Sequence, residues 1–211
     1  MKKLCIMTLI LTIIVNAGEY EYPFQNPDLS VEKRSEDLVS RLTLEEKIGQ
    51  LKNGAEAIPR LDIPEYNWWN ECLHGVARNG EATVFPQAIG LGATFDTSLV
   101  NDVSSVISTE ARAKFNINSA KGRRGKYQGL TFWSPNINIF RDPRWGRGHE
   151  TYGEDPYLMS QIGKSFVNGL QYGENEKYLK AAACAKHYAV HSGPEKLRHE
   201  FNAVVSKKDM H

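Results

Sequence analysis

Apolar residues recur at helical spacing near the start of the chain. Residues 29–51 predict two consecutive helices. Thr43 followed three residues later by Glu46 forms a capping box, which marks the start of the second helix. The apolar residues of that helix fall on one face: Leu44, Ile48 and Leu51.

Two further helices follow the same pattern. Asp96 or Thr97 caps the first, which carries Leu99, Val103, Val106 and Ile107 and is expected to fade near Lys114. Asp155 and Pro156 open the other, with proline at the first helical position, where its missing N–H does no harm. Its apolar residues are in register: Leu158, Ile162, Phe166 and Leu170.

Segments with strand character lie between these helices. The pattern predicts a loop and a strand over residues 58–73. It predicts a strand that passes into a polar loop over residues 130–140, and a strand of small apolar residues over residues 180–190. Helices and strands alternate without hairpin signals, which predicts an α/β fold with a parallel sheet. In such folds chemistry gathers at the carboxyl ends of strands. The richest polar clusters lie there: residues 67–78, 141–154 and 186–195.

The first seventeen residues differ from the rest. Lys2 and Lys3 precede an apolar run from Leu4 to Val15, and Ala17 ends the block. This order is typical of a secretory signal, and the run is too short for a stable membrane span. We therefore expect cleavage after Ala17 and export to the periplasm or the exterior, with no membrane contact of the mature form. A buried first helix is the less favoured alternative, because this segment has no polar face.

Composition excludes several classes of protein. The 211 residues are 41% hydrophobic and 24% charged, as in ordinary globular proteins. Loss of Lys2 and Lys3 would change the formal net charge from +1 to −1, which argues against a polyanionic partner. The basic, glycine-broken stretch 121–126 is therefore expected to be a mobile loop rather than a nucleic-acid patch.

Metal and cofactor sites are not indicated. Cys72, His74, Cys184 and His187 offer sulfur and nitrogen ligands, but their spacing matches no usual zinc motif. The two cysteines are expected to be structural or free, and a pair between them stays possible in an oxidising compartment. Gly90-Leu91-Gly92 lacks the remaining glycine of a dinucleotide loop.

The polar clusters combine flat rings with both signs of charge. Trp68 and Trp69 stand beside Glu71, and a pyranose stacks its CH faces on such rings while its hydroxyls need acceptors. Arg147 and the pair Lys186-His187 provide donors for the same hydroxyls. Each motif alone has an ordinary structural explanation, as core, ion-pair hub or solvated turn. Their combination favours a sugar pocket.

Four motifs in this order resemble glycoside hydrolase family 3. They are Thr43-Leu44-Glu45-Glu46-Lys47-Ile48, Asn67-Trp68-Trp69-Asn70-Glu71, Arg141-Asp142-Pro143-Arg144-Trp145-Gly146-Arg147 and Lys186-His187-Tyr188-Ala189-Val190-His191-Ser192-Gly193-Pro194. The resemblance runs from about Asp37 to the end of the chain and is strongest to the β-xylosidase branch. It implies the amino-terminal (β/α)8 TIM-like barrel domain over residues 37–211, after a signal (1–17) and a lead-in (18–36). It also implies that Glu71, Arg147, Lys186 and His187 hold the innermost sugar, beside Trp69.

The resemblance further implies an exo-acting, retaining β-xylosidase that releases terminal xylose from xylo-oligosaccharides. β-Glucosidases of the family tend to have Asp at the position of Glu71. We hypothesise that the longer Glu71, with Trp69, crowds the hydroxymethyl group of glucose and favours a pentose. β-Glucosidase or α-L-arabinofuranosidase activity is the alternative within the family, and a non-catalytic sugar-binding protein is the alternative outside it.

The catalytic pair is expected outside this chain. A retaining glycosidase needs a nucleophilic carboxylate and a second carboxylic acid ~5 Å away. The family's nucleophile is an aspartate in a later strand-end motif, which we expect beyond His211, and the acid/base residue generally comes from a further domain. A complete barrel usually needs ~250 residues, so we expect the barrel to be truncated before its last strands and the chain alone to be inactive. Glu150, Glu154 and Asp155 are interpreted as structural partners of Arg141 or Arg144.

Overall fold

The computed structural model describes residues 20–173, 177–191 and 193–210. The predicted signal (1–17) lies outside these residues. The chain divides into two compact units, with the boundary between Ile48 and Gly49. Within the described part, no helix is both long and apolar enough to cross a bilayer.

The first unit is helical and is held together by polar contacts. It contains the 3-10 turn Pro23–Gln25, helix α1 (Val31–Arg41) and most of α2 (Leu44–Gln50). Asp37 of α1 accepts a hydrogen bond from the Phe24 backbone N–H and a bidentate pair from Arg41. The two consecutive helices are thus confirmed.

The capping box at the start of α2 is also confirmed. The Thr43 N–H donates to the Glu46 carboxylate at 2.8 Å, and the Glu46 N–H donates to the Thr43 hydroxyl at 3.2 Å. The predicted apolar face is largely exposed, because Leu44 and Ile48 are 67% and 55% accessible. This face therefore does not enter a core in the structure.

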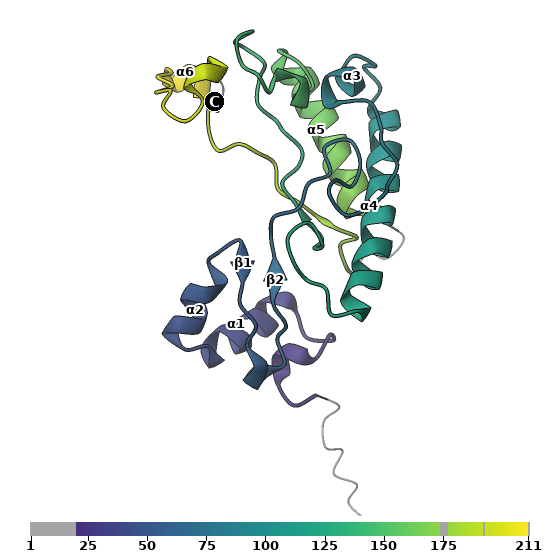
Figure 1. Cartoon of the computed structure of the whole chain (residues 1–211), viewed down its shortest axis with the longest axis vertical. Helices are drawn as coiled ribbons and strands as arrows, with labels where there is room; N and C mark the ends of the chain where they lie inside the picture. The colour runs from purple at the N-terminus through teal and green to yellow at the C-terminus, as the bar shows by residue number, and fades with distance from the viewer. Residues whose placement is uncertain (1–19, 174–176, 192, 211) are drawn as a thin grey trace, which may run out of the picture. The chain divides into compact units, whose positions relative to one another are not determined.

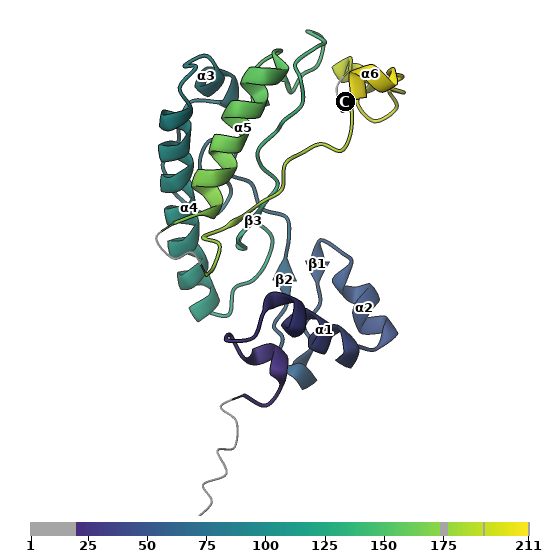
Figure 2. The ribbon, with the colours of Figure 1, turned by 180° about the vertical axis from the view of Figure 1, so that it is seen from behind.

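The second unit is built on two packed helices and two small sheets (Figures 1 and 2). Helices α4 (Thr97–Ala120) and α5 (Pro156–Gln171) lie side by side, and α3 (Ala88–Gly92) precedes them in the chain. Strands β1 (Gly54–Ala55) and β2 (Tyr66–Asn67) pair antiparallel. Strands β3 (Thr131–Phe132) and β4 (Ala182–Ala183) pair parallel. Short turns complete the unit: 3-10 helices Pro59–Leu61, Gly148–Glu150 and Glu195–Leu197, and helix α6 (Lys207–Met210).

The core lies between α4, α5 and the parallel strands. Ile162, Phe166 and Leu170 of α5 recur every four residues and are fully buried, as their spacing predicts. They pack in one cluster with Ile107 of α4 and Phe132 of β3. Asp155 caps α5 by accepting from the Leu158 N–H at 2.6 Å. The predicted start and apolar face of this helix are confirmed.

Helix α4 begins as predicted but is longer than expected. Asp96 accepts from the Leu99 N–H at 3.0 Å, which confirms the cap. The helix passes Lys114 and ends at Ala120, so the predicted end is wrong. The side chains of the last turns are tied to a neighbouring loop, since both Lys114 and Asn118 donate to Asn79. These tertiary contacts outweigh the weak helix propensity of the Asn-rich segment.

Strand pairing confirms the α/β expectation only in part. β3 and β4 are parallel and joined through α5, as the alternation predicts, and further parallel bridges link Asn70 to Phe132 and Asn136 to Lys186. The β1–β2 hairpin was not predicted, because strands of two residues leave no alternating pattern. The expected truncated (β/α)8 barrel is not seen. The described residues form two separate two-stranded sheets, whereas a barrel needs a staggered ring of strands.

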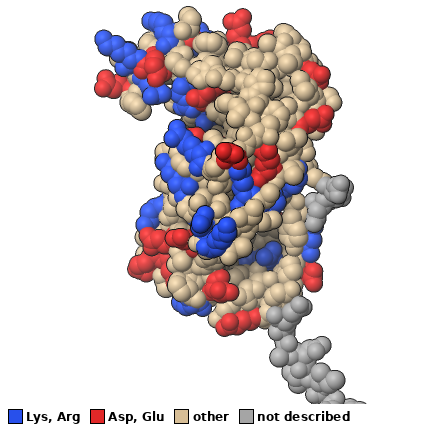
Figure 3. Space-filling view, turned by 45° about the vertical axis from the view of Figure 1, so that its right-hand side comes forward, with Lys and Arg blue, Asp and Glu red and all other residues tan. Residues whose placement is uncertain are grey.

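Charged side chains of both signs lie on the face of the molecule shown in Figure 3. Figure 3 shows lysine and arginine interspersed with aspartate and glutamate on the face it presents. Cys72 is buried and Cys184 is exposed, and both are free thiols. Burial raises the pKa of the Cys72 thiol, so this sulfur stays protonated at neutral pH.

Candidate functional site

Arg147 lies at the centre of a cluster of polar side chains in the second unit. It precedes the turn Gly148–Glu150 and binds Glu150 through two parallel hydrogen bonds of 2.7 and 2.6 Å. Gly148 is required there, because a Cβ would lie 2.2 Å from the Phe140 ring. The Glu150 hydrogen bonds raise the pKa of Arg147. The guanidinium is therefore fixed in position and permanently charged.

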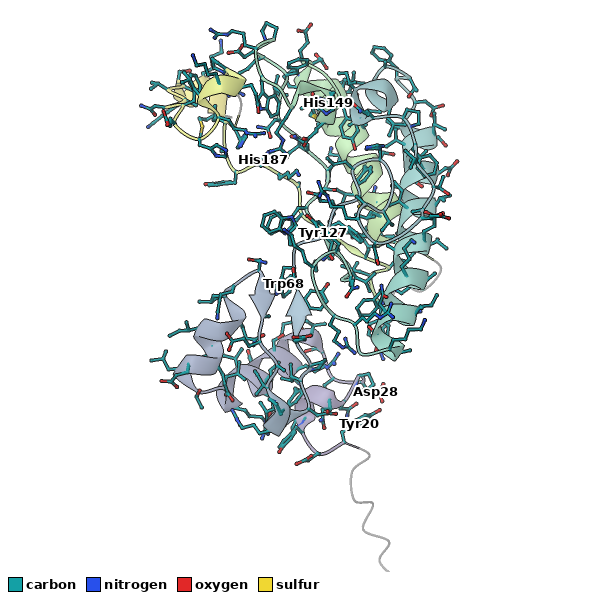
Figure 4. The ribbon with its side chains drawn as sticks, viewed as in Figure 1. Tyr20, Asp28, Trp68, Tyr127, His149 and His187 are labelled. Atoms are coloured by element: carbon teal, nitrogen blue, oxygen red, sulfur yellow. The ribbon has the colours of Figure 1, made fainter. Side chains whose placement is uncertain are left out.

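His187 contacts Arg147 and is held by Asn138. The Asn138 amide oxygen accepts from both the His187 backbone N–H, at 3.0 Å, and the ring Nδ1, at 2.8 Å. Because Nδ1 must then carry the proton, Nε2 is the acceptor for Arg147 Nη1, which lies 3.2 Å away. Figure 4 shows His187 on the segment that follows β4. In this structure both ring nitrogens of His187 are already engaged.

The histidine is held neutral by its surroundings. Burial, the largest cause, and the nearby charges of His191, Arg147 and Lys186 together lower the pKa of His187 to about 4, against an opposing effect of Glu150. The ring of His191 stacks on that of His187 with centroids 4.2 Å apart. The imidazole must be neutral for its Nε2 to accept a hydrogen bond from Arg147.

Lys186 reaches the cluster from the preceding position. Its backbone oxygen accepts from the Ile137 N–H at 2.7 Å, which places Lys186 beside the segment that follows β3. Burial lowers the pKa of Lys186, and the charge of Arg147 adds to this effect. Glu150 and Glu71 oppose it. The ammonium thus interacts electrostatically with both carboxylates.

Glu71 is placed by a buried asparagine. The Asn70 amide donates to the backbone oxygens of Asn67 and Thr131 and accepts from the Gly129 N–H at 2.8 Å. This network fixes the backbone that carries Glu71. The Glu71 carboxylate lies 3.6 Å from the exposed Arg78 and contributes to the raised pKa of Arg147.

Trp69 belongs to an aromatic group beside β2. Its ring stacks on Trp133 with centroids 4.6 Å apart, and the Lys126 ammonium lies 3.8 Å from its centroid. The Trp69 indole N–H is buried, and no other described residue accepts a hydrogen bond from it. Trp68 is the more exposed of the adjacent pair, and Figure 4 labels it near Tyr127.

The structure brings some of the predicted sugar-binding residues together and leaves Trp69 in a separate aromatic group. Arg147, Lys186 and His187 form one cluster, and Glu71 lies within electrostatic reach of Arg147 and Lys186. Trp69 packs instead with Trp133 and Lys126. The convergence comes from the parallel pairing, which aligns the segment after β3 with the segment after β4.

Two residues of this region were missed by sequence reasoning. Asn138 sets the tautomer of His187, and Trp133 stacks on Trp69. The sequence did contain a signal for Asn138 and Trp133, because both lie in the polar segment that follows β3. This is the strand end where chemistry is expected.

The predicted partner of Glu150 is wrong. Glu150 binds Arg147, whereas Arg144 binds Asp142 through hydrogen bonds of 3.0 and 2.9 Å. Burial raises the pKa of Glu150, but the hydrogen bonds and charge of Arg147 outweigh it, so the net shift is downward. A carboxylate held ionised in this way is a poor general acid.

Comparison with known proteins agrees with these motifs. The sequence profile described as "Glycosyl hydrolase family 3 N terminal domain" matches residues 35–209. A xylan 1,4-β-xylosidase of Xylanibacter ruminicola is 49% identical over 99% of this chain and 25% of its own length. A β-xylosidase/α-L-arabinofuranosidase of Medicago sativa subsp. varia is also 49% identical, over 92% of this chain and 26% of its own length. The chain thus spans about a quarter of the length of these relatives.

Solved structures give the same relationship. A family 3 exo-β-xylosidase in complex with a xylobiose aziridine probe aligns with a TM-score of 0.73 at 37% identity, covering 84% of this chain and 23% of that chain. A β-glucosidase from Erythrobacter marinus aligns with a TM-score of 0.60 at 26% identity, covering 81% of this chain and 27% of that chain.

Proposed function

Because the chain belongs to glycosyl hydrolase family 3, whose N-terminal domain matches residues 35–209, we propose that it is the sugar-binding part of an exported β-xylosidase. The longer protein releases terminal β-D-xylose from xylo-oligosaccharides. Residues 37–211 provide the first part of its (β/α)8 barrel, and residues 1–17 direct its export.

The observation that carries this proposal is the cluster of Arg147, Lys186, His187 and Glu71. Arg147 contacts His187 at 3.2 Å, and both Lys186 and Glu71 interact electrostatically with Arg147. Two cations and a carboxylate offer vicinal hydroxyls both donors and an acceptor. Within the described residues, three of the five N–H groups of Arg147 are used by Glu150 and His187, which leaves two for a ligand.

The roles differ from residue to residue. Glu71 accepts from two sugar hydroxyls, and Lys186 and Arg147 donate to them. His187 orients Arg147 through Nε2 and is thus a positioning residue. Trp69 forms the apolar side of the pocket together with Trp133.

Bond cleavage depends on groups that this cluster does not provide. In a retaining mechanism one carboxylate attacks the anomeric carbon while a carboxylic acid protonates the departing oxygen. Glu150 is committed to Arg147. We propose that later parts of the longer protein supply the nucleophilic aspartate and the acid/base residue, so the chain alone binds a sugar without turning it over.

α-L-Arabinofuranosidase activity is the second candidate. It is favoured by the Medicago relative, which is named for both activities. Both substrates end in a pentose, so both fit a pocket in which Glu71 and Trp69 crowd the hydroxymethyl group of glucose.

Calorimetric titration of the 211-residue chain with xylose and with glucose tests the proposal. Xylose should bind several-fold more tightly, and E71D should narrow that difference because a shorter side chain makes room for the hydroxymethyl group. E65Q, a change at an exposed carboxylate, is the control and should match the unsubstituted chain. Equal affinities for the two sugars would contradict the pentose preference, and release of nitrophenol from an aryl β-xyloside would contradict inactivity.

A further inference from the structure

A basic segment that the proposed sugar site does not use follows helix α4. Residues 121–127 carry four cations and no carboxylate, although the whole chain has 26 basic and 25 acidic residues. Hydrogen bonds hold the segment at two places. The Arg123 N–H donates to the Asn118 backbone oxygen at 2.8 Å, and the Tyr127 N–H donates to the Trp69 backbone oxygen at 3.0 Å. The segment is therefore attached to the motif that carries Trp69 and Glu71.

Lys126 lies directly on that motif. Its ammonium is 3.8 Å from the centroid of the Trp69 ring and 5.1 Å from that of Tyr127. Tyr127 has a left-handed backbone with a φ of 68°, which residues other than glycine rarely adopt. Such conformations persist only where the surroundings hold them, and they cluster at ligand sites. The turn at Tyr127 points to a role for the cation beside it.

Arg78 connects the segment to Glu71. Its guanidinium lies 5.5 Å from the centroid of the Tyr127 ring, and its Nε lies 3.6 Å from the Glu71 carboxylate. The proposed acceptor of sugar hydroxyls is thus separated from Lys126 by the side chains of Arg78 and Tyr127. A substituent on a sugar bound at Glu71 can extend along these side chains toward Lys126.

The cations of the segment are open to a ligand. Lys121, Arg123 and Lys126 are exposed, and Arg124 is half-buried. In the part of the chain that the structure describes, none of the four forms an ion pair with a carboxylate, whereas other arginines do: Arg78, Arg144, Arg147 and Arg198. Lysine ammonium and arginine guanidinium groups bind carboxylates through charge-assisted hydrogen bonds. The segment therefore suits an anionic group better than a neutral hydroxyl.

We propose that residues 121–127 bind the carboxylate of a uronic acid substituent on a xylo-oligosaccharide. The terminal xylose of this substrate occupies the cluster of Glu71, Arg147, Lys186 and His187. The inference rests on the proposed function and extends it to acidic substrates. A uronic acid branch places one negative charge on a pyranose ring, and each cation of the segment attracts that charge.

Calorimetric titration of the 211-residue chain with a matched pair of ligands tests this assignment. One ligand is a xylo-oligosaccharide with a single glucuronic acid branch on the residue next to its terminal xylose. The other is the same compound with that carboxylate converted to its methyl ester. The acid should bind about fivefold more tightly than the ester at low ionic strength. This ratio should fall toward one in 1 M salt, where the Debye length is about 3 Å.

Variants locate the preference for the acid. K126Q removes the cation over Trp69, and the double variant R123Q/R124Q removes two cations without changing that contact. Each should reduce the ratio of the two affinities at low ionic strength. K164Q, at an exposed lysine of α5, is the matched control and should retain the ratio.

The outcomes separate recognition of the carboxylate from sugar binding. Thermal melting identifies a variant that fails to fold, and the other variant then decides. If the unsubstituted chain binds acid and ester equally, or K126Q and R123Q/R124Q both keep the full ratio, carboxylate binding at 121–127 is overturned and the proposed function stands. A ratio that K164Q lowers as much as K126Q does would indicate a general effect of net charge and would also overturn it. If neither ligand nor xylose binds, the proposed function fails as well.

Discussion

At the scale of single residues, the main result is that His187 and Arg147 act as a unit. Asn138 fixes the proton on Nδ1, and Nε2 accepts from Arg147. The arrangement needs a neutral ring, and burial lowers the pKa of His187 to about 4. Protonation of His187 would place a cation against Arg147 and break their hydrogen bond.

This coupling predicts a pH-dependent stability. In the unfolded chain His187 has its ordinary pKa near 6.5 and takes up a proton as pH falls below it, whereas in the folded chain it stays neutral until about pH 4. The unfolded state therefore binds more protons between these values, and the free energy of unfolding should fall as pH is lowered from 7 to 5. Denaturant titrations at both pH values measure the fall.

Substitution isolates the contribution of His187. H187Q keeps a hydrogen-bonding side chain that does not titrate between pH 7 and 5. Its free energy of unfolding should therefore change less over this range than that of the unsubstituted chain. H199Q, at an exposed histidine, should retain the slope of the unsubstituted chain. If the free energy of unfolding changes equally with pH in H187Q and in the unsubstituted chain, His187 is not held neutral.

Sequence reasoning identified the members of this cluster but not their connections. Arg147, Lys186 and His187 were found because each stands in a dense polar motif at or after the carboxyl end of a predicted strand. The proton position on His187 depends on Asn138, which is 49 residues away, and spacing does not encode such a pairing. The partner of Glu150 was missed because three arginines in one motif are equivalent by sequence and differ only in where the backbone places them.

At the scale of elements, the crossing of α4 and α5 sets the geometry of the second unit. Gly169 of α5 lies against α4, where a Cβ would come within 2.1 Å of the Ser104 hydroxyl and 2.2 Å of the Asn101 backbone oxygen. Ser108 also donates to the Gly169 backbone oxygen at 3.1 Å. The helices thus approach through small residues.

We expect G169A to destabilise the chain by about 1–3 kcal/mol, because a methyl group cannot enter without separating the helices. G163A on the same helix is the matched control, since its Cβ would meet only the Ile137 side chain at 3.4 Å. That change should be neutral or stabilising by up to about 1 kcal/mol through helix propensity. Denaturant midpoints of both variants measure the difference, and equal midpoints would rule out close packing at Gly169.

Helices were predicted better than strands for a physical reason. The starts of α4 and α5 follow from Asp96 and Asp155, whose side chains act within three residues. Strands depend on distant partners, so the segment predicted over 180–190 is paired as a strand only at Ala182–Ala183. The β1–β2 hairpin depends likewise on the pairing of Gly54 with Asn67, which leaves no local pattern.

At the scale of the molecule, the described residues form a part of the fold that the family implies. The parallel pair β3–β4 with α5 between its strands is a β/α crossover unit, while the expected ring of strands is not present in the described segments. The chain spans about a quarter of its relatives' length. This coverage is consistent with the proposal that the chain contributes sugar binding and that bond cleavage needs further parts of a longer protein.

The central claim is that Glu71, Arg147, Lys186 and His187 form one sugar site. The most direct measurement is a xylose titration of the isotope-labelled chain, followed by NMR at backbone amides. Shifts should concentrate at Ala77, whose N–H is bonded to the Glu71 backbone oxygen, and at Arg147 and His187, while Gly163 in α5 should not move. Shifts that avoid Arg147 and His187, or no shifts at saturating xylose, would contradict the account.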